Sequence, residues 1–213
     1  MPRPQVHNQA MIEPSSAADA RPGLRERKKA KTRQAIQEQA LRLFREQGYD
    51  RTTVEQIAEA AEVSPSTFFR YFPTKEDTVL YDALDPLLIE AFRRQPMSLT
   101  PLRAMREAMH EVWGALTPEQ MDEQIERGRL AYVVPALRER YVLEMVRTGG
   151  LMVELVAERL GRDPSDFEIR VATAAAMGGV LAAMLPMYDG RPGVDAIELV
   201  DRAVEVLERG IRL

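Results

Sequence analysis

The chain has 213 residues, of which 45% are hydrophobic and 29% are charged, and it contains no cysteine. This composition is typical of a globular protein, and it excludes disulfides and thiolate chemistry. Because no apolar run reaches about 18 uninterrupted residues, we expect no membrane-spanning segment. The lack of cysteine agrees with a cytoplasmic location.

Charge is distributed unevenly along the chain. Residues 24–75 contain 11 Lys and Arg against 7 Asp and Glu, whereas residues 76–213 contain 16 against 24. A basic segment followed by an acidic one favours a protein of which one part meets a polyanion such as nucleic acid. A solvated surface could carry the same charges, so the neighbouring motifs must decide.

The beginning of the chain differs in composition from the rest. Residues 1–22 are rich in Pro, Ala and Ser and lack an apolar core, so we expect a disordered tail rather than a signal peptide. A basic run follows and leads into a helix over residues 30–50, for which Gly48 is a suitable end. The apolar stripe of this helix consists of Ile36, Ala40, Leu43 and Phe44.

Residues 52–75 predict two short helices joined by a tight turn. Thr53 is a good N-cap for the first helix, and Ser64 followed by Pro65 is a good start for the second, which Pro73 ends. Two such helices form a helix-turn-helix, whose second helix fits the major groove of DNA. Plain core packing can produce the same pattern, but here a basic run directly precedes it.

The second helix of a helix-turn-helix reads base edges with residues near its N-terminus. By position these residues are Ser64, Ser66 and Thr67, and Phe69 is placed to contact a thymine methyl group. We expect Ser64 to act mainly as the N-cap. Hydroxyl groups bond to several bases, so these residues do not predict the sequence of a DNA site.

The motif and its surroundings resemble the TetR family of bacterial transcriptional regulators over roughly residues 27–80. The match is specific in residue type and in spacing. The matching residues are the basic arm, Phe44-x3-Gly48-Tyr49, Thr52-Thr53-Val54-x2-Ile57-Ala58-x2-Ala61 and Val63-Ser64-x2-Thr67-Phe68-Phe69-x-Tyr71-Phe72-Pro73-x-Lys75-Glu76. The resemblance implies that Thr53, Tyr71 and Lys75 contact phosphates. The basic arm, which includes Arg27, Lys28 and Lys29, is expected to lie along the DNA backbone or to enter the minor groove.

Two residues depart from the family pattern. Glu62 stands in the turn of the motif, where the family usually has glycine, and a left-handed backbone there would cost about 1 kcal/mol. Phe69 stands where the family usually has a tyrosine whose hydroxyl meets a phosphate. We therefore expect Phe69 to pack or to make an apolar contact.

The chain after Pro73 has helical periodicity throughout, so we predict an all-α protein of about nine helices. The expected organisation is a tail (1–22), a helix-turn-helix head (23–75) and a helical body for ligand binding and dimerisation (76–213). Pro86 should kink or break a helix over 76–92. Further helices are expected over residues 100–113, 117–130, 135–160, 164–188 and 192–209.

The helix predicted over 164–188 is rich in small residues, which let two helices approach closely. A buried central helix would have the same composition. The family resemblance favours a twofold dimer interface, in which this helix and the last one form a four-helix bundle with their copies. The expected interface residues are Ala175, Gly178, Gly179, Ala182, Val204 and Leu207.

Methionines are frequent in the body, either as core filler or as the lining of an adaptable apolar cavity. The cavity hypothesis places a ligand against Met105, Met109, Trp113, Met145, Met152 and Met177, with Tyr132 and His110 as nearby polar groups.

The leading functional hypothesis is a ligand-responsive regulator of transcription. It would bind double-stranded DNA at a pseudo-palindromic operator as a homodimer, repress, and be released by a small apolar effector such as an acyl-CoA or another elongated lipophile. A DNA-binding protein without an effector would instead have a filled core. We expect the protein to be cytoplasmic and associated with the nucleoid through DNA, with no membrane partner.

An enzyme is the disfavoured hypothesis. The chain has 2 histidines, no metal-ligand spacing and no glycine-rich phosphate loop, so we expect no metal and no cofactor. An acidic cluster on one helix is better explained as a solvated face. Its members are Glu119, Asp122, Glu123 and Glu126.

Overall fold

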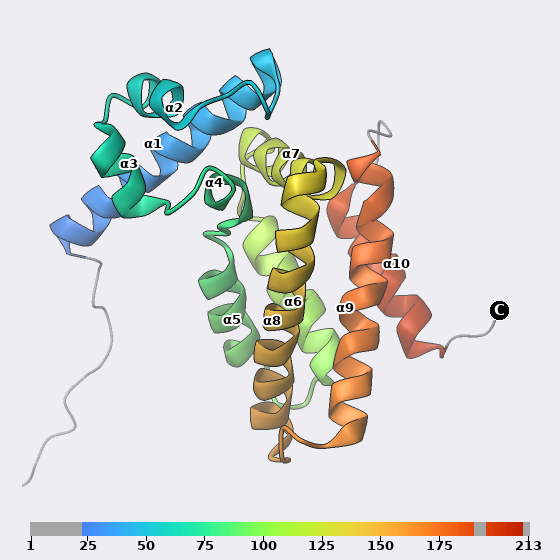
Figure 1. Cartoon of the computed structure of the whole chain (residues 1–213). Coiled ribbons are helices and arrows are strands. Elements are labelled where there is room, and N and C mark those ends of the chain that lie inside the picture. The colour runs from blue at the N-terminus through green and yellow to red at the C-terminus, as the bar shows by residue number, and fades with distance from the viewer. Residues whose placement is uncertain (1–22, 190–194, 211–213) are drawn as a thin grey trace, which may run out of the picture.

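The computed structural model describes residues 23–189 and 195–210. Within these ranges the chain forms ten helices and no strand, which confirms the all-α prediction (Figure 1). The expected tail over 1–22 and the expected helix start at Pro192 lie outside the described residues.

The head contains α1 (Leu24–Gln47), α2 (Val54–Ala60), α3 (Pro65–Tyr71) and the single turn α4 (Asp77–Leu80). Figure 1 shows α2 and α3 lying against the long α1. Their apolar faces share one core, which the large side chains Ile36, Phe44, Ile57, Phe68, Phe72 and Val79 fill with at most 4% of each exposed. The predicted stripe of α1 therefore faces the helix-turn-helix.

The start of α1 corrects the sequence prediction. The helix begins at Leu24, so the basic run is part of the helix instead of a segment that leads into it. Its residues, RERKKAK, are strong helix formers, and their charges need no burial at this exposed end. The basic side chains consequently project from a rigid helix.

The caps of the two short helices form as predicted. The Thr53 hydroxyl accepts from the Gln56 N–H, and the Gln56 side chain accepts from the Thr53 N–H, which completes a capping box. The Ser64 hydroxyl accepts from the Thr67 N–H at 3.1 Å. Between the helices, Glu62 has φ of 54°, so the turn does adopt the left-handed conformation that favours glycine.

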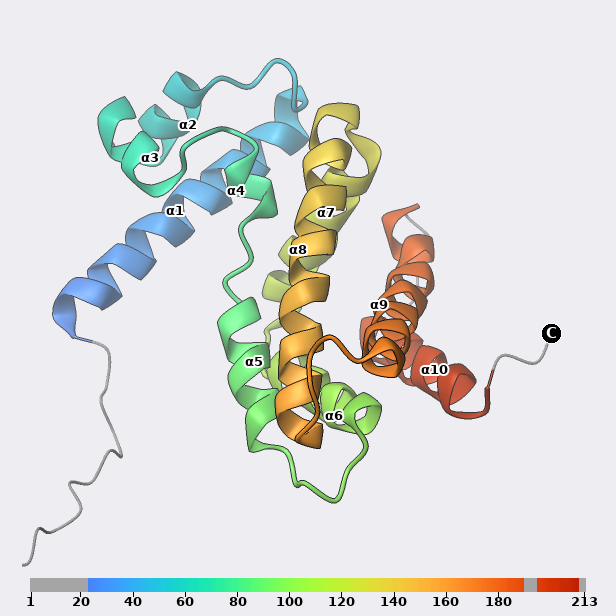
Figure 2. The same cartoon turned by 60° about the horizontal axis from the view of Figure 1, so that its bottom comes forward.

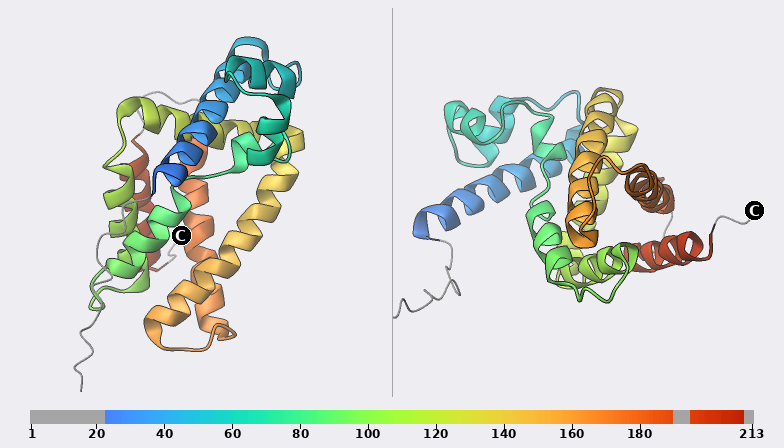
Figure 3. Two further views of the ribbon diagram at one scale, coloured as in Figure 1. Left: turned by 90° about the vertical axis from the view of Figure 1, so that its left-hand side faces the viewer. Right: turned by 90° about the horizontal axis from the view of Figure 1, so that it is seen from below.

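The body is a bundle whose two longest helices, α8 and α9, run side by side and are joined at the end far from the head (Figures 1 and 2). Its helices are α5 (Asp85–Arg94), α6 (Pro101–Trp113), α7 (Pro118–Val133), α8 (Pro135–Leu160), α9 (Phe167–Tyr188) and α10 (Ala196–Glu208). Seen from below, α5, α6 and α10 follow one another around α8 and α9 (Figure 3).

Two helix boundaries differ from the expected ones. The helix expected over 76–92 is broken at residues 81–84, so Pro86 lies in the first turn of α5 rather than inside a helix. The start of α9 is Phe167 and not Pro164, because the Asp166 carboxylate caps the helix by accepting from the N–H groups of Glu168 and Ile169.

The segment that leads into α4 is bonded to the head, whereas α4 itself packs against both α1 and α7. Lys75 donates to the carbonyls of Tyr49 and Thr52, and the Tyr49 hydroxyl donates to Glu76 at 2.7 Å. Val79 lies in the core that the head residues share with Leu130, Ala131 and Leu137 of the body. We therefore propose that the boundary between head and body lies in the linker 81–84 instead of after Lys75.

Helix α9 is long and apolar enough to cross a membrane, judged by length and composition alone. The search for an uninterrupted apolar run did not find this helix, because Thr173 interrupts its apolar stretch. Only 17% of its apolar window is buried in the monomer. An exposed apolar helix of this kind is typical of a surface that a partner covers.

Candidate functional site

The N-terminus of α3 carries three hydroxyl groups that bond to one another. The Ser64 hydroxyl lies 2.9 Å from that of Ser66 and donates to Thr67 Oγ1 at 3.0 Å. Ser64 and Ser66 are exposed, and Thr67 is half-buried. The structure thus brings the three predicted base-reading residues together at one end of the helix.

Aromatic side chains fix the orientation of α3. Phe68 and Phe72, four residues apart, are 0% and 1% exposed within the head core. Phe69 follows Phe68 but points outward, with half of its surface exposed and its ring edge-on to that of Phe68 at 5.5 Å. An exposed phenylalanine on this face is available for apolar contact with a base or a sugar.

A basic groove separates the start of α1 from α3. It contains Lys28, Lys29 and Tyr71 of the predicted contacts, and Arg27 is exposed on the same part of α1. Arg70 was missed by the sequence analysis, although it lies directly between two predicted contacts. The full lining is Leu24, Arg25, Glu26, Lys28, Lys29, Thr32, Arg70 and Tyr71. Such a groove suits a phosphate backbone.

Lys75 has structural contacts that the sequence did not predict. Its ammonium group donates to the Tyr49 carbonyl at 2.9 Å and to the Thr52 carbonyl at 3.0 Å, and it lies 4.1 Å from the centre of the Tyr49 ring. These contacts join the end of the helix-turn-helix to the turn after α1. A phosphate contact by Lys75 or Thr53 stays a prediction.

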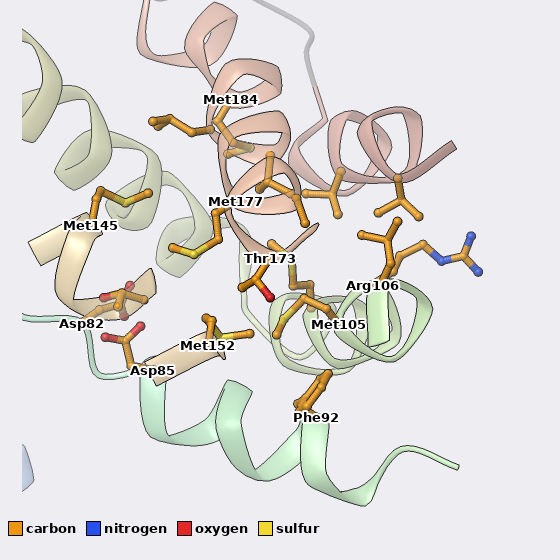
Figure 4. A pocket seen from close by; sticks show the side chains of 18 of the residues that line it. Asp82, Asp85, Phe92, Met105, Arg106, Met145, Met152, Thr173, Met177 and Met184 are labelled. Carbon is orange, nitrogen blue, oxygen red and sulfur yellow. The ribbon is translucent and has the colours of Figure 1, made fainter. Parts of the chain in front are cut away.

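Helices α5 to α10 surround a cavity of about 750 Å³ that is partly open to solvent. Its volume is within the usual range for a small-molecule site, roughly 300–1,000 Å³. Figure 4 shows the side chains of Met145, Met152 and Met177 turned toward a shared space, with Phe92 on the neighbouring α5. Six of the predicted ligand residues line it, namely Met105, Met109, Trp113, Met145, Met152 and Met177.

The two polar groups expected in the cavity lie elsewhere. Tyr132 is not part of the lining; its ring lies 6.3 Å from that of Tyr188 and 5.7 Å from the Arg138 guanidinium. His110 joins α6 to α10 through Asp201, at 2.7 Å. Helical periodicity could not separate inward from outward positions on these faces, since both residues have apolar neighbours on their helices.

Other polar side chains form one end of the cavity, near the head. They are Asp82, Asp85, Arg127, Tyr141, Glu144 and Tyr188. Gly128 makes room for one of them, because a Cβ there would lie 2.5 Å from the Tyr188 ring. A glycine inside a helix is the sequence signal that could have pointed to this close approach.

Burial changes the acidity of this polar end. It raises the pKa of Asp85 to about 6, with a further contribution from the charge of Asp82, while Arg127 opposes the shift. Burial likewise raises the pKa of Tyr188 to about 12 and raises that of Tyr141. The tyrosines are therefore neutral hydrogen-bonding groups, whereas the Asp85 carboxylate is ionised at neutral pH at some energetic cost.

Arg127 connects the cavity to the head. It is 9% exposed, lines the cavity, donates to the Val79 carbonyl of α4 at 3.1 Å and pairs with Asp82 at 3.5 Å. From α8, Arg140 donates to Thr74 and Asp77 at the other side of α4. A change in cavity shape at Arg127 thus acts directly on an element packed into the head.

The predicted dimer residues divide into two groups. Ala175, Gly178 and Ala182 are exposed on α9, and a Cβ at Gly178 would meet nothing within 4 Å. Val204 is only 2% exposed in the monomer core, which corrects its assignment to the interface. The Leu207 side chain lies 3.1 Å from a Cβ built on Gly179, so this glycine serves packing of α10 on α9 within the chain.

The helix-turn-helix, the basic groove and the helical body together define a bacterial DNA-binding regulator of transcription. Comparison with family models agrees, because residues 36–81 match bacterial regulatory proteins of the tetR family and residues 99–212 match the MftR C-terminal domain. The chain belongs to the TetR family, whose members are transcription regulators and not enzymes.

Individual relatives support this assignment. The HTH-type transcriptional regulator TcmR of Streptomyces glaucescens is 37% identical over 171 residues, which is 76% of each chain. Thermus thermophilus FadR, a TetR-family repressor in complex with lauroyl-CoA, is 26% identical with a TM-score of 0.57 over 85% of this chain and 95% of its own. NalD of Pseudomonas aeruginosa shares the fold, with a TM-score of 0.50 at 23% identity over 86% of this chain and 97% of its own.

Proposed function

We propose that this protein is a repressor that binds a pseudo-palindromic operator as a homodimer and leaves the DNA when a small apolar effector fills the cavity. One observation carries the proposal: Arg127 both lines the cavity and holds α4, which is packed into the head. An effector would act by binding more tightly to the body conformation in which the two heads are wrongly spaced.

The remaining parts of the proposal have separate support. The exposed small-residue face of α9 suits close packing against its copy about a twofold axis. The related FadR is described as a repressor in complex with lauroyl-CoA, which supports both repression and an elongated lipophilic effector. The site of action would be the cytoplasm, where the protein associates with the nucleoid through its operator.

A DNA-binding protein without an effector is the second candidate. It would need no cavity in the body, whereas these helices leave a partly open space of about 750 Å³, within the usual size of a small-molecule site. The cavity therefore favours the effector-responsive regulator.

The first experiment selects operators from fragmented DNA of the source genome at rising salt. The proposal expects retention of a short inverted repeat near a promoter, at a ratio of two chains per site. Uniform recovery that disappears with salt would leave only phosphate attraction and would contradict a specific regulator. Lauroyl-CoA and simpler lipophiles are then titrated against the operator complex, with release measured by fluorescence anisotropy.

A further inference from the structure

The end of the cavity near the head has an unpaired negative charge. Figure 4 shows the carboxyl groups of Asp82 and Asp85 at the same end, beside Met145 and Met152. Asp82 pairs with Arg127, which also donates to a backbone carbonyl. Asp85 has no side-chain hydrogen bond or ion pair within residues 23–189 and 195–210. Asp85 therefore has no direct partner at this end, although the charges of Arg127 and Arg147 act on it from a distance.

Two phenol rings line the same end. The faces of tyrosine rings attract cations, and the attraction grows when water is excluded. The Tyr188 ring can occupy this position only because Gly128 has no Cβ, which would lie 2.5 Å from the ring. Tyr141 comes from α8, so rings from two different helices flank the acidic end.

The arginines elsewhere in the lining already have partners. Arg106 lies 2.7 Å from Glu107 and 3.8 Å from Asp201, and Arg162 lies 2.9 Å from Glu168. Arg127 is occupied by Asp82, as described above. The cavity thus presents no unpaired arginine to an anionic ligand, while it presents an unpaired carboxylate to a cationic one.

A second polar group inside the cavity also lacks a partner. Thr173 of α9 is 6% exposed, lines the cavity, and its buried hydroxyl has no hydrogen bond in the described structure. Figure 4 shows it turned toward the space between Met105, Met152 and Met177. A buried unpaired hydroxyl costs about 1–3 kcal/mol, and a ligand with a polar group along its length would satisfy it.

We propose that the effector is a lipophilic cation, whose protonated amine binds Asp85 and Asp82 between the rings of Tyr141 and Tyr188 while its apolar body lies among the methionines. The inference rests on the proposed function, because it names the chemical class of the effector. Asp85 as a residue is exposed at the mouth of the cavity, so a cation can reach its carboxylate and form an ionic hydrogen bond there.

The test compares three probes that share a dodecyl chain and differ in the head group: dodecylamine, dodecanol and dodecanoate. Trp113 is the only tryptophan of the chain and lines the cavity, so its fluorescence reports binding, with calorimetry as a second readout. We expect the amine to bind at least about tenfold more tightly than dodecanoate, as an ionic hydrogen bond in a partly dry site allows.

Two variants assign the effect to the carboxylate. Asp85→Asn should weaken the amine at least about tenfold and change dodecanol by less than about twofold, because the neutral probe does not use the charge. Asp122→Asn is the matched control, since Asp122 is exposed on α7 outside the cavity lining and loses the same charge. The control should leave all three affinities unchanged.

Three outcomes would overturn the proposal: tighter binding of dodecanoate than of the amine, an unchanged amine affinity in Asp85→Asn, or no binding of any probe by either readout. If dodecanoate or lauroyl-CoA binds and releases the operator while the amine does neither, the cationic class is wrong and the proposed function stands. If no probe binds although an operator is selected, the effector part of the proposed function fails as well.

Discussion

The head and the body of this protein are packed in different ways. The core of the head is closed within the monomer, with Phe68, Ile57 and Ile36 each 0% exposed, and Leu130, Ala131 and Leu137 of the body contribute to it. The body surrounds a cavity of about 750 Å³, and its helix α9 is largely exposed although it is apolar. A head that reads DNA must keep a fixed shape, whereas the body of the monomer leaves a cavity and an apolar helix face uncovered.

The largest expected effect concerns the core of the head, the more tightly packed of the two parts. Phe68→Ala should lower the free energy of unfolding by about 3–5 kcal/mol, because it leaves a cavity in the head core. Urea denaturation measures the change. Phe69→Ala is the control, since Phe69 is half exposed; it should cost less than about 1 kcal/mol yet reduce operator affinity. Equal losses in the two variants would contradict the assigned roles.

The junction between the two halves should give the next largest effect. Arg127→Gln leaves Asp82 without its partner and weakens the bond to the Val79 carbonyl, so we expect a loss of about 2–3 kcal/mol. We also expect effector binding to continue without releasing the operator. The control Arg129→Gln removes an exposed pair with Glu126 and should cost less than about 0.5 kcal/mol. Normal release by Arg127→Gln would disprove the coupling.

The exposed face of α9 can be tested at a glycine that has free space in the monomer. Gly178→Glu should weaken the proposed dimer at least about tenfold, or about 1.4 kcal/mol, because the close approach of two small-residue helices leaves no room for the side chain. Sedimentation equilibrium measures association. Gly150→Glu places the same side chain in open space on α8 and should leave association intact. Dimers of unchanged affinity in Gly178→Glu would place the interface elsewhere.

The incomplete packing of the body predicts a stabilising substitution. Thr173→Val replaces an unpaired buried hydroxyl with a methyl group of similar shape, so the free energy of unfolding should rise by about 1 kcal/mol. Thr148→Val, at a half-buried position of the same cavity, should change it less. A loss of stability in Thr173→Val would mean that the hydroxyl has a partner in solution, such as a bound water.

The smallest effect concerns the one strained position of the head. Glu62→Gly should stabilise the protein by about 0.5 kcal/mol, since relief of a left-handed backbone exceeds the extra entropy of glycine in the unfolded state. Glu59→Gly, within α2, should instead cost about 1 kcal/mol. Thermal melts of the two variants should therefore shift in opposite directions.

The sequence determined local features wherever a short-range signal was sufficient. Thr53 and Ser64 cap their helices, and Gly161 ends α8 in the left-handed conformation, because caps depend on residues within one turn. The spacing of four residues between Phe68 and Phe72 agrees with their burial on one face of α3. The left-handed turn at Glu62 followed from the resemblance to the family, not from the preference of glutamate.

Only the tertiary structure decided which faces of the body helices point inward. Val204 and Ala182 both fit an apolar helix face, yet Val204 is buried within the monomer and Ala182 is exposed. Tyr132 was predicted as a polar group of the cavity, yet it is Tyr188, which was not predicted, that lines it. Helical periodicity defines an apolar face but not its neighbour, because the neighbour comes from distant residues.

The same limit explains the polar end of the cavity. Asp85, Arg127 and Tyr188 are separated by long stretches of sequence and meet only where α5, α7 and α9 converge. No spacing rule links them, since the distance along the chain does not determine the distance between helices in a bundle. Local hydrogen bonds and side-chain entropy set the helices and their caps, whereas burial of apolar area among remote segments sets the site.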